Sequence, residues 1–247
     1  MLLTASRFTA THGFSTREGG VSEGPLASLN LGRAVGDAPD NVQQNARRLA
    51  QAAGLPVRAL VTVKQVHGDA VHDVVRGGEA DAFGDPQTEA DAMVTRTPGL
   101  ALCIQTADCV PVLLHAPDVH AVGAAHAGWR GTILDIAGAT VRRLVAFGAQ
   151  PEAMQAVIGP AIHRCCYEVD EALAQRFADR FGAEVVLRGE RRPHLDLVEA
   201  NRRALLGAGL SADRIEAMPH CTSCDRRFFS HRRDEGRSGR QISFVAL

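Results

Sequence analysis

The chain has 247 residues, with 27 basic and 28 acidic side chains and a formal net charge of −1. This near balance, without a basic tract beyond short Arg-Arg pairs, argues against a nucleic-acid-binding protein and favours a small-molecule partner. No apolar run approaches the roughly 20 residues that cross a bilayer, and the N-terminus lacks the pattern of a secretion signal, so no membrane association is expected. We expect a soluble cytoplasmic protein, whose six cysteines are thiols, metal ligands or nucleophiles rather than disulfides.

Apolar residues at helical spacing predict helices in four segments: 40–54, 131–148, 170–182 and 196–209. In the first segment, Asp40 is expected to cap the N-terminus and Gly54 to end the helix. In the second, Thr132 is the expected cap and Gly148 follows the last turn.

Short runs rich in β-branched and apolar residues predict strands at 59–63, 70–75, 91–95, 100–105, 110–115, 120–125, 155–159 and 241–246. Because strands and helices interleave without strict β-α-β alternation, we predict an α+β (mixed α/β) fold of mixed sheets in a single domain, 1–247. Three segments rich in glycine and polar residues are expected to be surface loops: 11–24, 76–89 and 230–240.

Two apolar runs within 106–132 are separated only by Ala-Pro-Asp. A tight turn at Pro-Asp would pair Ala116 with Val119 and, in continued register, Cys109 with His126. Their Cβ atoms would then lie about 4.5 to 5.5 Å apart on one face of the ladder. A zinc ion fits between such side chains, and so does a Cys-His nucleophile pair. A buried thiol beside a hydrogen-bonded histidine is the third interpretation.

A third ligand is available in His67, which follows the strand-like run 59–63 and precedes Gly68, where the chain can turn closely. Two imidazoles and a thiolate leave one tetrahedral position open, which is typical of a catalytic zinc site. Cysteine with imidazole also holds copper, which is therefore the alternative metal.

The sequence Cys-Thr-Ser-Cys at 221–224 is a second metal candidate. It is the less favoured one, because no second CxxC occurs in the chain. Cys165 and Cys166 are adjacent and poorly spaced to complete a structural site with it.

The segment from Trp129 to Thr132 leads into the second predicted helix, where free N–H groups favour an anion and Arg130 can fork onto phosphate. A solvated arginine with Trp129 in packing is the alternative. Lys64 is the only lysine and lies three residues before His67, which makes it a further candidate.

Several motifs together resemble those of the YfiH/laccase-domain family, also called multicopper polyphenol oxidase-like or PgeF proteins: HGFSTREGGVSEGPLASLNLG, KQVHGDAV, ADAMVTRTPGLALCIQTADCVPVLL, AAHAGWRGT, IGPAIHRCCYEV and FFSHRRDEGRSGRQISFVAL. The resemblance covers essentially the whole chain. It implies mixed sheets flanked by helices in a layered sandwich, and a single zinc bound by His67, Cys109 and His126. It further implies phosphorolysis of adenosine, guanosine, inosine or methylthioadenosine, with adenosine deamination as a second reaction. Older naming implies copper-dependent phenol oxidation, and bacterial members suggest editing of peptidoglycan precursors.

Residues can be assigned to that chemistry. Arg130 with the helix start would hold phosphate, and the open metal position would activate water for deamination. Asp108, beside Cys109, is a candidate proton relay, although strand alternation would turn it to the opposite face and a loop-end role is equally compatible. Further candidates for substrate contacts are Ser15, Arg17, Lys64, Gln65, His163, Cys166, His231 and Arg232.

On the strength of this resemblance, we expect a zinc-dependent purine nucleoside phosphorylase and adenosine deaminase, with purine nucleoside and phosphate as partners and a monomer as the expected form. Three rivals remain. One is a cysteine hydrolase with Cys109 as nucleophile and His126 as base. Another is an adaptor protein in which zinc is structural. A multicopper oxidase is the weakest, because the ten histidines include no HxH pair.

Overall fold

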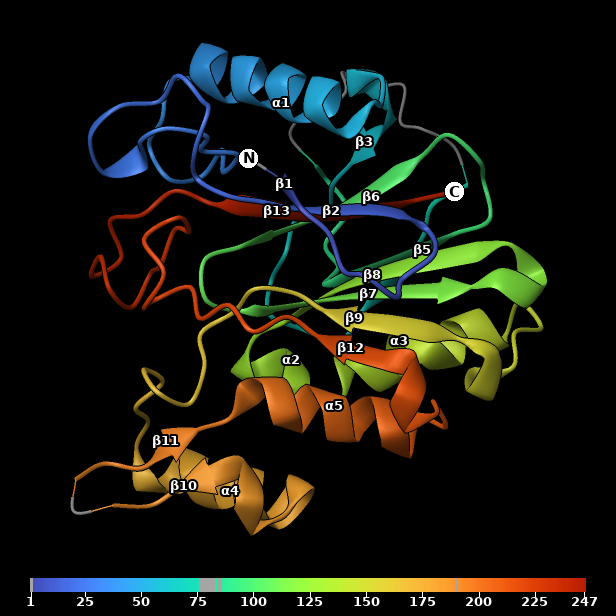
Figure 1. Ribbon diagram of the computed structural model, residues 1–247, viewed down its shortest axis with the longest axis vertical. Coiled ribbons are helices and arrows are strands. Elements are labelled where there is room, and N and C mark those ends of the chain that lie inside the picture. Colours follow the sequence, from blue (N-terminus) through green and yellow to red (C-terminus); the bar gives the residue numbers. More distant parts are fainter. Residues whose placement is uncertain (1, 76–82, 84–85, 190) are drawn as a thin grey trace.

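The computed structural model describes residues 2–75, 83, 86–189 and 191–247. These residues form four layers, in which two sheets face each other and helices cover the outer side of each (Figure 1). The predicted α+β fold of mixed sheets flanked by helices is therefore confirmed.

One sheet of the described residues has the order β1 (Leu2–Leu3), β2 (Thr11–Ser15), β13 (Gln241–Ala246), β6 (Ala101–Thr106) and β3 (Leu60–Val61). The other has the order β12 (Ile215–Ala217), β9 (Gln155–Ile158), β7 (Val110–Ala116), β8 (Ala121–Ala127), β5 (Ala92–Thr95) and β4 (Val71–Asp73). A short antiparallel pair joins β10 (Val186–Leu187) to β11 (His194–Leu195). Both large sheets are mixed, since β3–β6, β12–β9 and β4–β5 are parallel pairs and the other pairs are antiparallel.

The α-helices of the described residues are α1 (Pro39–Ala53), α2 (Trp129–Ile133), α3 (Ile136–Val145), α4 (Glu171–Phe181) and α5 (Leu197–Gly207). Single 3₁₀ turns occur at Gly24–Leu26, Val57–Ala59, Pro117–Val119, Pro151–Ala153, Ala183–Val185 and Ala212–Arg214. Helix α1 lies over the first sheet and α2, α3 and α5 over the second (Figure 1). A helix with the length and apolar character for crossing a membrane is not present in the described part of the chain.

Apolar side chains from both sheets fill the space between them. Phe14 and Ile104 of the first sheet belong to the same buried cluster as Leu113, Val122 and Val157 of the second. The outer faces of the sheets are also covered, so β7 and β8 are buried on both sides along nearly their whole length. This explains why their sequences are continuous apolar runs rather than alternating patterns.

Two predicted helix caps are wrong. Helix α1 starts at Pro39, whose missing N–H suits the first turn, and Asp40 lies inside the helix rather than at its cap. The segment 131–148 divides into α2 and α3, and Asp135 caps α3 by accepting a hydrogen bond from the Gly138 N–H. Thr132 instead donates its hydroxyl to the carbonyl of Gly128.

The predicted register of the β7–β8 hairpin is wrong by two residues. The turn is a 3₁₀ turn followed by His120 in the left-handed region, so Ala116 pairs with Ala121 rather than Val119. His126 consequently lies opposite Pro111, and Cys109 directly precedes β7. A shift of two residues preserves the facing of side chains, whereas a shift of one would reverse it.

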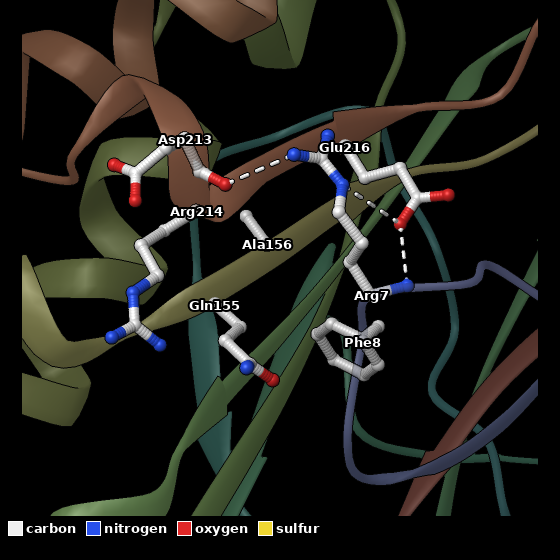
Figure 2. Close-up of a pocket in the computed structure, with 7 residues that line it drawn as sticks. All are labelled: Arg7, Phe8, Gln155, Ala156, Asp213, Arg214 and Glu216. Carbon is white, nitrogen blue, oxygen red and sulfur yellow. Dashed lines mark hydrogen bonds and ion pairs between the residues drawn. The ribbon is translucent and has the colours of Figure 1, made fainter.

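The N-terminal region is more regular than predicted, because Thr11–Ser15 of the expected loop 11–24 forms strand β2. The segment before it is hydrogen-bonded to β12. The Glu216 carboxylate accepts from the backbone N–H of Ser6 and from that of Arg7, which Figure 2 shows. The pocket between this segment and β12 is lined by none of the predicted site residues. Of the expected loop 76–89, residues 76–82 and 84–85 lie outside the described residues.

Candidate metal centre

The structure brings the three predicted metal ligands together. His67 lies in the loop after β3, Cys109 directly before β7 and His126 in β8. One ligand atom from each lies within 4.8 Å of the others, and the two imidazole rings meet edge to face with centroids 4.8 Å apart. One sulfur and two nitrogen donors at this separation suit a single ion with an open coordination position.

A buried carboxylate that the sequence analysis did not identify holds two of these ligands. Asp91, at the start of β5, accepts hydrogen bonds from the backbone N–H groups of Val66, His67 and Gly68 at 3.1, 2.9 and 2.6 Å. It also lies 2.8 Å from Nδ1 of His126. Because an ionised carboxylate only accepts, Nδ1 carries the proton and Nε2 is left as the ligand nitrogen.

The charged forms of Cys109 and His126 stabilise each other. Burial would raise the pKa of Cys109, but His126 and His67 lower it to about 6. Burial would lower the pKa of His126, but Cys109 and Asp91 raise it to about 9. The thiolate, the form that binds metal ions, is thus stabilised at neutral pH.

Gly128 leaves room for the ligands. A Cβ at this position would lie 3.0 Å from Sγ of Cys109 and 3.1 Å from Cδ2 of His67, both tighter than ordinary contacts. The sequence alone does not explain why a glycine is needed at this position, because the contact involves three separate segments of the chain.

The metal ligands lie in the wall of a cavity of about 640 Å³, a size that suits a small-molecule ligand. The predicted residues that line it are Lys64, Gln65, His67, Asp108, Cys109, His126, His231 and Arg232. Further lining residues that sequence reasoning missed include Arg33, Gln105, Tyr167 and Arg240.

Gln65 connects two segments of the cavity wall through its side-chain amide. Its Nε2 donates to the carbonyl of Gln105, and its Oε1 accepts from the N–H of the same residue, both at 2.8 Å. This doubly bonded amide joins the His67 loop to the end of β6. Lys64 lies on the same loop, 2.8 Å from Glu89.

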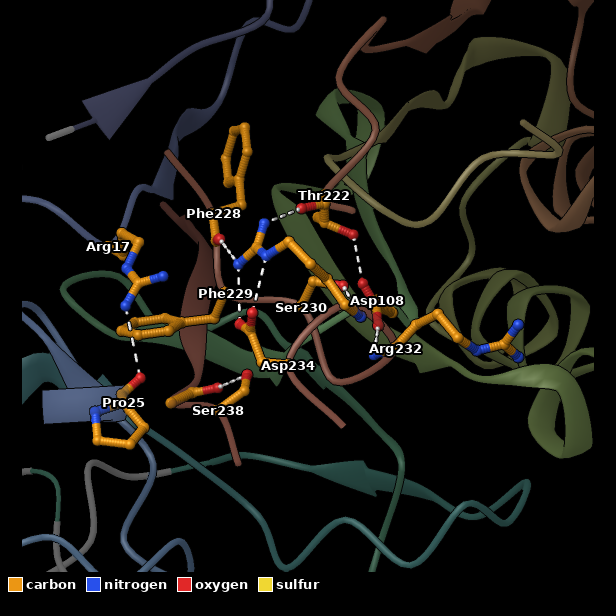
Figure 3. Close-up of polar contacts among 12 residues, drawn as sticks. Arg17, Pro25, Asp108, Thr222, Phe228, Phe229, Ser230, Arg232, Asp234 and Ser238 are labelled. Atoms are coloured by element: carbon orange, nitrogen blue, oxygen red, sulfur yellow. Dashed lines mark hydrogen bonds and ion pairs between the residues drawn. The ribbon is translucent and has the colours of Figure 1, made fainter. Parts of the chain in front are cut away.

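Asp108 faces the cavity, contrary to the expectation from strand alternation. Its φ of 89° takes it out of the extended conformation, so alternation does not apply. Its carboxylate accepts from the Thr222 hydroxyl at 2.6 Å and from the Arg232 backbone N–H at 2.7 Å (Figure 3). The Arg232 guanidinium donates to the carbonyl of Glu168 at 2.9 Å and lies 5.2 Å from the ring centroid of Tyr167.

Two predicted arginines lie outside the cavity lining. Arg17 donates its Nε to the carbonyl of Ala27. Its guanidinium packs over the ring of Phe229 and donates to the carbonyl of Pro25 (Figure 3). Arg130 is exposed, with its guanidinium 5.1 Å from the ring of Trp129. The remaining candidates for substrate contacts also lie outside the lining of this cavity. They are Ser15, His163 and Cys166.

Arg240 is one of the lining cations that sequence reasoning missed. Burial lowers its pKa, while the charges of Cys109 and Asp108 oppose that shift. Its guanidinium donates to the carbonyls of Ser238 and Gly239 at 2.8 and 2.9 Å. Guanidinium N–H groups form strong hydrogen bonds to anions, so Arg240 is a candidate contact for an anion in the cavity. Only its place in the predicted loop 230–240 connects it with function in the sequence.

Comparison with known proteins gives consistent matches over nearly the full length. Residues 11–247 match the family described as multi-copper polyphenol oxidoreductase laccase. A purine nucleoside phosphorylase of Deinococcus radiodurans is 43% identical over 100% of this chain and 92% of its own. Purine nucleoside phosphorylase YlmD of Geobacillus stearothermophilus is 41% identical over 96% of this chain and 89% of its own. The crystal structure of YlmD from that organism has a TM-score of 0.92 at 38% identity, covering 98% of this chain and 93% of that one.

Proposed function

The chain belongs to the multi-copper polyphenol oxidoreductase laccase family, and we propose that it is a zinc-dependent purine nucleoside phosphorylase. The observation that carries the proposal is the group of His67, Cys109 and His126 in the wall of a cavity that also presents arginines. Relatives named purine nucleoside phosphorylase match nearly the whole chain. The proposed substrates are adenosine, guanosine, inosine and methylthioadenosine, with phosphate as the second substrate.

The ligand set supports zinc, with copper as the alternative metal. His67, Cys109 and His126 offer the mixed nitrogen and sulfur donors of open zinc sites, and Asp91 orients His126 as carboxylates do behind zinc-bound histidines. In each His/Cys group of the described part of the chain, the ligand atoms lie close enough together to bind a single metal ion. Zinc at this position would supply a Lewis acid and lower the pKa of water.

The cavity residues suit phosphorolysis. In this reaction a phosphate oxygen bonds to C1′ of the ribose while the bond from C1′ to purine N9 breaks, and the purine leaves with the electron pair and takes up a proton. Arg232 and Arg240 line the cavity, and we propose that they hold phosphate through charge-assisted hydrogen bonds. The Asp108 carboxylate lies in the same wall, where it can stabilise positive charge that develops on the sugar.

As a second reaction we propose deamination of adenosine in the same cavity. Water adds at C6 of the purine, ammonia leaves, and protons must move from the water to the departing nitrogen. Asp108 is the candidate for that transfer, since Thr222 and the Arg232 backbone hold its carboxylate at the cavity wall.

A cysteine hydrolase is the second candidate function. The specific observation in its favour is the Cys109–His126 pair, in which His126 lowers the pKa of the thiol. Such an enzyme would use Cys109 to attack the substrate and would keep its activity when metal is removed.

The test is a nucleoside panel assayed with and without phosphate on protein of known metal content. We expect purine release that needs phosphate, is lost on chelation and returns with zinc. In His67→Ala, purine release and ammonia release should fall together while the fold is retained. Activity that survives chelation would favour the cysteine hydrolase, and oxidation of a phenol that requires added copper would favour the oxidase.

A further inference from the structure

A second group of potential metal ligands lies outside the cavity. It consists of Cys165 and Cys166, which follow β9, and of Cys221 and Cys224, which follow β12. Their sulfur atoms all lie within 4.8 Å of one another. Since β9 and β12 are parallel neighbours, their carboxyl ends are at the same sheet edge, and the segments that follow emerge side by side. The sequence-based judgement that these cysteines are poorly spaced for one site is therefore corrected.

The sulfur positions match a four-thiolate site. With a zinc–sulfur distance of about 2.3 Å, a regular tetrahedron places its sulfur atoms roughly 3.8 Å apart. Sγ of Cys224 lies 3.6 Å from that of Cys165 and 3.2 Å from that of Cys166. Cys224 is therefore close enough to both Cys165 and Cys166 for the three sulfurs to bind one ion.

Backbone hydrogen bonds close the turns that carry these cysteines. The N–H of Cys166 donates to the carbonyl of His163, and the N–H of Asp225 donates to that of Cys221, which closes a turn around each cysteine pair. The N–H of His163 also points at Sγ of Cys221, at 3.4 Å. A donor to sulfur favours the charged thiolate that a metal requires.

We propose that Cys165, Cys166, Cys221 and Cys224 bind one zinc ion as a closed, structural site, separate from the His67 centre. Four protein ligands leave no position for water or substrate, in contrast to three at the cavity. Cys165 and Cys224 are exposed, so an ion has access from solvent, whereas Cys221 is buried. All four are free thiols, and ligation needs no oxidant because binding only displaces thiol protons.

The site joins two segments of the cavity wall. The segment after β9 carries Tyr167, and the segment after β12 carries Thr222, which bonds to Asp108. The two are in direct contact, since the Thr222 N–H donates to the carbonyl of Ala161 at 2.9 Å. A zinc ion at this junction would hold both segments in place without taking part in the reaction.

Metal analysis of the full chain, purified under reducing conditions with zinc supplied, tests the proposal. Cys224→Ser should contain one zinc ion per chain fewer than the wild type. This difference isolates the four-cysteine site whatever metal the His67 centre holds. Cys109→Ala should retain the site, and Cys103→Ala, which alters a buried cysteine outside both groups, should match the wild type.

Two further measurements test the site, and the second of them needs only the wild type. Cobalt loaded in place of zinc should give intense sulfur-to-cobalt absorption, most of which Cys109→Ala keeps and Cys224→Ser loses. Alkylation of the four cysteines should be at least tenfold slower with zinc than after chelation. Equal metal content in the wild type and Cys224→Ser, equal alkylation with and without zinc, iron in place of zinc, or disulfides in the reduced preparation would each overturn the assignment.

Discussion

The carboxylate of Asp91 lies 2.8 Å from Nδ1 of His126 and is fully buried beneath the loop that carries His67. The same carboxylate accepts hydrogen bonds from three backbone N–H groups of that loop. One side chain thus orients a histidine in β8 and shapes the segment that presents another. The geometry of the metal centre depends on a residue that does not itself offer a ligand to the ion.

Replacing this carboxylate should weaken metal binding. We expect Asp91→Asn to lower zinc affinity by about 10- to 100-fold, the usual effect of removing a partner behind a metal-bound histidine. The amide nitrogen would also face backbone donors, at a cost of about 1 to 3 kcal/mol in unfolding free energy. Competition with a chromophoric chelator and thermal unfolding measure the two effects. Asp69→Asn, an exposed carboxylate in the same loop, is the control, and an equal loss of affinity there would contradict the assignment.

Gly128→Ala should disturb the centre through a steric contact. The added Cβ would lie 3.0 Å from Sγ of Cys109, so the thiolate or the His67 ring must move. We expect weaker zinc binding and a loss of activity with secondary structure retained. Gly207→Ala, where a Cβ meets no atom within 4 Å, should leave both unchanged. Normal zinc affinity in Gly128→Ala would show that the site tolerates the added methyl group.

Kinetics can separate Arg240, proposed here to bind phosphate, from Arg130, which the sequence predicted for that role. Arg240 lines the cavity, whereas Arg130 lies outside the lining residues. Loss of a hydrogen bond between charged groups costs about 1.5 to 3 kcal/mol. We therefore expect Arg240→Ala to raise the phosphate KM at least tenfold, and more than Arg130→Ala does. The reverse order would support the phosphate role that the sequence suggests for Arg130.

The metal-free protein should contain an unusually reactive thiol. Because His126 and His67 lower the pKa of Cys109 to about 6, its thiolate is present at and above neutral pH and is lost as pH falls below about 6. Alkylation of Cys109, followed by peptide mass spectrometry across pH, should show that midpoint. Cys103, whose pKa is raised by burial, is the internal control and should stay unreactive. A Cys109 midpoint at the ordinary thiol value, about 8.5, would contradict the described charge pairing.

Local pattern was sufficient for much of the fold. The apolar runs at 110–115 and 120–125 predict the strands β7 and β8, and a proline-containing turn between them predicts the hairpin. The hairpin still brings Cys109, directly before β7, within 4.8 Å of His126 between ligand atoms, although the register differs by two residues. Such features depend on neighbours in sequence, and hydrophobic periodicity and turn chemistry describe those neighbours directly.

The remaining features depend on contacts between distant segments. Asp91 reaches the His67 loop only because β5 pairs with β8, and Arg240 enters the cavity wall only through the loop before β13. The cysteine pairs after β9 and β12 are brought together by the parallel pairing of those strands. The sequence by itself determined the strands β3 to β9 and β13, the helices α1, α4 and α5, and the residue types able to bind a metal, but not β1, β2 or β10 to β12. Tertiary structure alone decided which of them meet, because side-chain proximity across a sheet edge follows from strand order and register, and neither is encoded in local spacing.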